Sequence, residues 1–156
     1  MTNRTSTALK QTIETVFADV PYPGDENITR CPYECRECRR IANFFKGRQW
    51  TGQTAEELRQ YHVALSLFTP QAFRYFLPAF MLVSLDGYER GDVIPDAVRF
   101  VFEYSEEVQG HFAVRMSKFS LAQRHAIIDY LVEMERKGAG SSEHAIGLLS
   151  EDSAFE

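Results

Sequence analysis

The sequence lacks a long apolar run. Its longest apolar stretch, residues 76–83, is interrupted by Pro78, whereas a helix that crosses a membrane needs about 20 apolar residues. Residues 1–11 are polar and lack the apolar segment of a secretory signal. We therefore expect a protein that does not contact a membrane and that resides in the cytoplasm.

Cysteine is also scarce, with three residues in a chain of 156. An odd number of cysteines without an export signal argues against a disulfide framework and indicates reduced thiols. The contents of 44% hydrophobic and 25% charged residues are typical of a globular domain rather than a disordered chain. The length fits one domain, and we predict that residues 1–156 form a single helical domain.

Apolar residues recur at three- and four-residue steps, and this spacing predicts helices. The segments concerned are residues 7–19, 32–45, 55–68, 70–85 and 121–137, and a last short helix is expected after Ser142. The predicted fold class is mainly α, a compact helical domain of about five to seven helices. Within it, we predict that Phe73, Leu77 and Phe80 are buried, because they follow the helical step in the most apolar segment.

Several residues are suited to begin or interrupt these helices. Capping boxes are formed by Thr54 with Glu57 and by Ser120 with Gln123. Cys31 is expected to cap the helix that begins at residue 32, where a proline suits the first helical position. Pro78 should kink or split its helix, since it removes a backbone donor.

Residues 97–116 fit two structures. Apolar residues alternate along 98–104 and again along 112–116, a pattern that indicates two short strands, so a small β-hairpin is predicted near residues 98–116. A helix that follows Pro95 fits the same residues.

The segment YHVALSLFTPQAFRYFLPAF, residues 61–80, is long and distinctive. It resembles the core of a bacterial domain-of-unknown-function family (DUF6714-like), and the resemblance extends over roughly residues 17–95. The residues after Phe100, which include part of an acidic cluster, lie outside it. The resemblance implies no activity and transfers no catalytic residue to this chain.

Cys31, Cys35 and Cys38 form a C-x3-C-x2-C pattern that would place three thiols on one side of a helix. Zinc prefers four such ligands, and none of the four histidines (His62, His111, His125 and His144) stands at a diagnostic spacing. We therefore expect no metal and no other cofactor, with Cys35 and Cys38 buried as small apolar side chains. A thiol- or zinc-dependent regulator that uses the three cysteines is the alternative.

His62 and Ser66 lie one helical turn apart, which suits a hydrolase-type enzyme. Nucleophilic catalysis also needs an orienting acid and an oxyanion site, and the sequence has no G-x-S-x-G motif. We expect His62 to be a core histidine that is hydrogen-bonded to a backbone carbonyl. No catalytic residue is assigned, and we do not expect an enzyme.

Charge is distributed unevenly along the chain. Residues 30–48 contain six bases and two acids, and with nearby aromatic residues they resemble a nucleic-acid patch. The chain as a whole has a net charge of −5, so we expect no nucleic-acid binding. Residues 86–107 contain two bases and seven carboxylates, namely Asp86, Glu89, Asp92, Asp96, Glu103, Glu106 and Glu107.

We interpret these seven carboxylates as a partner-binding surface, since their spacing matches no calcium loop, and we expect Asp92, Glu103 and Glu106 to be exposed. Complementary charge favours association with a basic protein. The sequence therefore predicts a non-enzymatic protein-binding module. Its most concrete form is an immunity or antitoxin protein that binds and blocks a basic partner such as a toxin.

Overall fold

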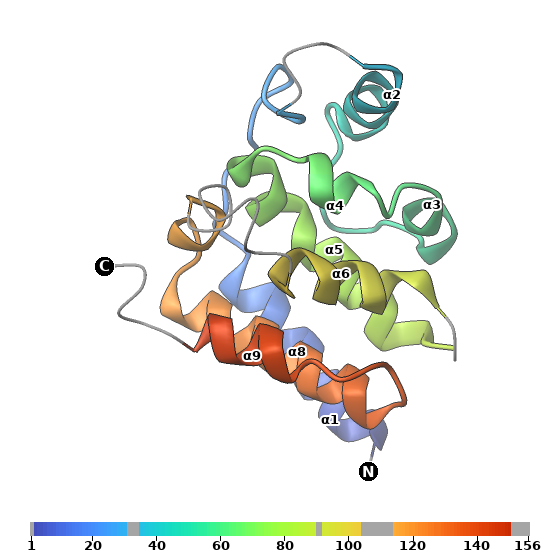
Figure 1. Ribbon diagram of the computed structural model, residues 1–156, viewed down its shortest axis with the longest axis vertical. Helices are drawn as coiled ribbons and strands as arrows, with labels where there is room; N and C mark the ends of the chain where they lie inside the picture. The colour runs from blue at the N-terminus through green and yellow to red at the C-terminus, as the bar shows by residue number, and fades with distance from the viewer. Residues whose placement is uncertain (1, 31–34, 90–91, 104–113, 151–156) are drawn as a thin grey trace.

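The computed structural model describes residues 2–30, 35–89, 92–103 and 114–150. The chain forms a compact, mainly α domain (Figure 1), as predicted from the sequence. The labelled helices are α1 (Thr2–Val16), α2 (Arg36–Phe45), α3 (Ala55–Gln60), α4 (Ala64–Leu67), α5 (Pro70–Gly87), α6 (Val93–Glu103), α8 (Leu121–Arg136) and α9 (Glu143–Leu149). Residues 114–117 form a further helical turn.

Helix α5 lies at the centre of the molecule. It packs against α1, α3, α6 and α8, while α9 covers α6 and α8. Figure 1 shows α1, α8 and α9 at one end of the molecule and α2 at the other. Because α5 is apolar around most of its circumference, it is stable only where other helices cover it on all sides. Phe73, Leu77 and Phe80 are buried as predicted.

Aromatic rings fill the core where α2, α4 and α5 meet. The ring of Phe45 lies 5.0 Å from that of Phe68 and 4.8 Å from that of Phe76, measured between centroids. Tilted and edge-to-face arrangements at these separations are favourable because of the ring quadrupoles. The core therefore joins the N-terminal helices to α5 through aromatic and aliphatic side chains.

Both Thr54 and Ser120 cap helices as predicted, and of the two predicted capping boxes the one at Ser120 has both of its reciprocal bonds. Thr54 accepts a hydrogen bond from the Glu57 backbone and caps α3. At α8, the Ser120 hydroxyl accepts from the Gln123 backbone at 3.1 Å, and the Gln123 side chain accepts from the Ser120 backbone at 3.0 Å. Such reciprocal bonds satisfy backbone donors that a helix start leaves unpaired.

The predicted β-hairpin is wrong. Residues 98–103 belong to α6, and residues 114–117 are helical as well; the remainder of the proposed hairpin lies outside the described residues. Helix α6 buries Ile94, Val98, Val101 and Phe102, which follow the helical step, and Phe100 is exposed. The apolar alternation along 98–102 thus arises from one exposed residue between two buried positions.

Several details of the helices differ from the prediction or decide between its alternatives; α1, for example, spans Thr2–Val16 rather than residues 7–19. Helix α2 begins at Arg36 with Cys35, rather than Cys31, as its cap. The helix expected over residues 55–68 is interrupted by a turn at 61–63, where the Tyr61 ring stacks on Phe44 at 3.9 Å between centroids. Of the two effects expected of Pro78, a kink or a split, the split does not occur, since α5 is a single helix from Pro70 to Gly87. No helix in the described parts of the chain is long and apolar enough to cross a membrane.

Candidate functional site

A groove with a volume of about 490 Å³ runs between the segment around α4 and helix α6. We call it the α4–α6 groove; it is lined by His62, Val63, Ser66, Val93, Asp96, Ala97, Arg99, Phe100 and Glu103. Three of its apolar side chains are unusually exposed: Val63 at 36%, Val93 at 42% and Phe100 at 51%. Large apolar side chains that gather at a concave surface are typical of binding sites.

The apolar lining of the groove comes from the helical step of α6. Val93, Ala97 and Phe100 are separated by four and three residues, so they share one face of the helix. The buried residues of α6 occupy the opposite face, against α5 and α9. Helix α6 therefore presents one apolar face to the core and a second one to the groove.

Charged side chains border this apolar lining. The Arg99 guanidinium lies 3.1 Å from the Asp96 carboxylate and 3.8 Å from that of Glu103. The Asp96 side chain is 59% exposed, whereas that of Arg99 is 22% exposed. Because one cation is shared by two carboxylates, the border of the groove keeps a net negative charge. Arg99 also packs closely on Gly140, where a Cβ atom would lie 2.1 Å from Nη1 of Arg99.

Those predicted partner-binding carboxylates that the structure describes lie in different places. Asp96 and Glu103 lie in the groove. Asp86 is exposed and forms an ion pair with Lys10 of α1, in a separate hollow near Lys137. Glu89 is exposed. Glu106 and Glu107 lie outside the described residues.

Asp92 has a structural position, and the expectation that it is exposed is wrong. Its side chain is 2% exposed and forms an ion pair with Arg59 at 3.0 Å. Its Oδ1 atom also accepts a hydrogen bond from the Ile94 backbone at 3.1 Å, at the start of α6. The bond to Asp92 raises the pKa of Arg59. Asp92 thus fixes the start of α6 on α3 and positions the groove without lining it.

His62 lines the groove and is half-buried, so it is not the core histidine that was expected. Within the described residues, no hydrogen bond joins its ring to Ser66 or to a carboxylate. A nucleophilic Ser–His pair needs both of these contacts. The Ser66 carbonyl instead accepts hydrogen bonds from Arg30 at 3.2 Å and Arg115 at 2.9 Å.

The cysteines lie away from the groove. Cys35 is exposed, which contradicts the expected burial, and its sulfur accepts a hydrogen bond from the Cys38 backbone at 3.3 Å. Cys38 is buried, as predicted. Cys31 lies outside the described residues. In the parts of the chain that are described, no three side chains of histidine, cysteine, aspartate or glutamate lie together as metal ligands would.

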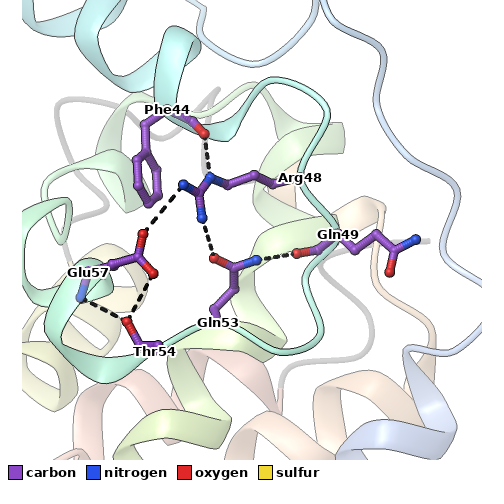
Figure 2. A network of polar contacts seen from close by, with 6 residues as sticks. All are labelled: Phe44, Arg48, Gln49, Gln53, Thr54 and Glu57. Carbon is purple, nitrogen blue, oxygen red and sulfur yellow. Dashed lines mark hydrogen bonds and ion pairs between the residues drawn. The ribbon is translucent and has the colours of Figure 1, made fainter.

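Part of the basic segment is occupied by internal contacts. Figure 2 shows the Arg48 guanidinium donating to the Phe44 carbonyl at 2.7 Å and to Gln53 at 3.1 Å, with Glu57 3.4 Å away. Its guanidinium carbon also lies 3.8 Å from the centre of the Phe44 ring. These contacts hold α2 on α3, so Arg48 has a structural role rather than that of a phosphate-binding side chain.

Fold and groove together define a compact helical protein with an exposed, partly apolar groove. The chain belongs to the family described as "Family of unknown function (DUF6714)", which matches residues 5–149. The match extends well beyond the residues 17–95 that the sequence motif indicated, and it includes the whole acidic segment. No curated protein and no solved structure matches the chain significantly.

Proposed function

We propose that this protein is a non-enzymatic binding module that recognises a basic partner protein through the α4–α6 groove. The observation that carries this proposal is the exposure of Val63, Val93 and Phe100 around one concavity. Monomeric proteins seldom gather exposed apolar side chains in this way unless the patch binds something. The partner would insert an apolar side chain, because the lining between the two segments is mostly apolar.

The charges of the groove support a basic partner. Asp96 is the most exposed ion-pairing carboxylate at its border, and the chain has a net charge of −5. A lysine or arginine beside the inserted side chain would compete with Arg99 for Asp96 and Glu103. Exposed carboxylates farther away, at Asp86 and Glu89, would attract the same partner over a longer range.

The concrete form of the proposal is an immunity or antitoxin protein, which acts by covering the working surface of a basic toxin in the cytoplasm. A small acidic module of this kind needs no catalytic group, because occupancy alone inhibits the partner. Its affinity would depend on a few buried anchors at the centre of the interface, as in protein complexes generally. Phe100 is the anchor that the groove offers.

The test begins with capture of partners from the source cytosol on immobilised wild-type protein, followed by binding kinetics. Phe100→Ala should mainly accelerate dissociation, and Asp96→Lys should slow association severalfold at low salt, with a smaller effect at high salt. The matched controls are Leu121→Ala and Asp129→Lys on α8. Both residues are exposed outside the groove, and their variants should bind like the wild type.

Two outcomes would contradict the proposal at different levels. If the wild-type protein captures no protein, the binding module is wrong, and the exposed Cys35 thiol makes the thiol-dependent regulator the next function to test. If a partner is captured but the groove variants bind like their controls, the protein binds through another surface.

A further inference from the structure

Two arginines from distant parts of the chain meet at one backbone carbonyl. Nη2 of Arg30 and Nη2 of Arg115 donate to the Ser66 carbonyl at 3.2 and 2.9 Å. Arg115 is buried, with 8% of its surface exposed, whereas Arg30 is exposed. Because both guanidinium groups contact the same oxygen atom, their positive charges lie close together and repel each other. The carbonyl supplies only a partial negative charge to offset this repulsion.

The other arginines with ionic contacts are arranged differently. Each has a carboxylate partner; they are Arg40, Arg48, Arg59, Arg99 and Arg136. Among the described residues, no carboxylate forms an ion pair with Arg30 or Arg115. Burying a guanidinium without a counter-ion is costly. Burial, followed by the proximity of Arg30, lowers the pKa of Arg115 to about 10.

The packing around the two side chains fixes this arrangement in advance. Arg30 is held beside α4 by the bridge between Thr29 and Phe68 and by the bond from its own backbone to the Leu67 carbonyl at 3.1 Å. Arg115 is flanked by the buried Met116, and its guanidinium carbon lies 4.9 Å from the centre of the Phe73 ring. A site that packing holds in place avoids much of the cost of ordering on binding.

We propose that Arg30 and Arg115 form a binding site for an oxyanion, either a phosphate or a carboxylate group. A guanidinium has five N–H donors in a planar fork, which suits two-oxygen contacts with such groups. Each of the two forks has donors beyond the Nη2 contact to Ser66. A bound oxyanion would neutralise the buried charge and relieve the repulsion between the arginines. This inference is independent of the proposed partner protein.

The experiment uses the full chain and two probes, inorganic phosphate and acetate, each titrated against sodium chloride at equal ionic strength. Calorimetry and thermal unfolding measure binding to the wild type, to Arg30→Gln and to Lys46→Gln. Arg30 is exposed, so its replacement should leave the fold intact, and Lys46→Gln removes the same charge from another exposed position. We expect saturable binding, weakened about tenfold or more by Arg30→Gln and unchanged by Lys46→Gln.

A second variant separates geometry from charge. Arg115→Lys keeps the positive charge but loses the planar fork, so it should weaken oxyanion binding while Lys46→Gln does not. Tighter binding of phosphate than of acetate would identify a phosphate site, and the reverse would identify a carboxylate site. The proposal is overturned if neither phosphate nor acetate produces more binding heat or thermal stabilisation than sodium chloride at the same ionic strength. It is also overturned if Arg30→Gln binds both probes like the wild type.

Discussion

At the scale of single residues, Phe73 lies where three parts of the molecule meet. Its ring is 5.7 Å from that of Phe102 on α6 and 5.8 Å from that of Phe119 ahead of α8, between centroids. Phe73→Ala should lower the free energy of unfolding by about 3–5 kcal/mol, because it leaves a cavity that three elements border. Phe100→Ala is the control, since the same truncation at an exposed position should cost less than about 1 kcal/mol. Urea denaturation measures both, and equal losses would contradict the prediction.

Residue-level predictions from sequence succeeded where the signal was local. The burial of Phe73, Leu77 and Phe80 follows from their spacing in one apolar segment. Asp92 was predicted to be exposed because nothing near it in the sequence indicates a partner. Its partner, Arg59, lies 33 residues earlier, and only the folded chain brings the two together.

At the scale of elements, Gln123 connects three helices. Its side chain completes the capping box of α8, accepts from Arg74 of α5 at 3.2 Å and donates to the Val16 carbonyl of α1 at 2.8 Å. Gln123→Ala should therefore lower the free energy of unfolding by about 2–3 kcal/mol, since it removes three part-buried hydrogen bonds of the Gln123 side chain. Ser120→Ala removes only the cap and should cost about 1 kcal/mol. Thermal and urea unfolding measure the loss of unfolding free energy in each variant. A larger loss for Ser120→Ala than for Gln123→Ala would contradict the prediction.

Helix ends were predictable where a capping residue marks them. The start of α3 follows from its cap at Thr54 and that of α8 from its capping box, and α8 ends as expected before Gly138, whose φ of 113° favours glycine. The break at residues 61–63 has no such marker; the stacking of the Tyr61 ring on Phe44 at this turn joins residues of two different helical segments and is seen only in the folded chain. The apolar alternation near Phe100 fits a strand as well as a helix with two apolar faces, so the hairpin prediction failed there.

At the scale of the whole molecule, one apolar core extends from Leu9 in α1 to Leu149 in α9. Calorimetry should therefore record a single unfolding transition whose measured enthalpy equals the van't Hoff enthalpy, as for one cooperative domain. Two separable transitions would show that the α2–α3 end unfolds independently. The test also addresses the prediction that residues 1–156 form one domain.

The α4–α6 groove was beyond reach of the sequence alone. Acidic residues on α6 were identified from charge, but the apolar residues Val93 and Phe100 were not, because their face becomes visible only once α6 is known to be a helix. The opposite wall, at Val63, comes from a segment 30 residues earlier. Composition and charge were enough to suggest the proposal of a binding module, and the fold was needed to propose a surface for it.

During synthesis on the ribosome, α1 emerges long before α8, one of the helices that cover it. The bond between Gln123 and Val16 joins residues 107 positions apart, and that between Ser6 and Glu133 joins residues 127 positions apart. At about 5–20 residues per second, α1 waits about 5–20 seconds for α8 to be translated. During that interval, the face of α1 that α8 covers in the folded chain is available to chaperones. The native fold can therefore form only after most of the nascent chain has been made.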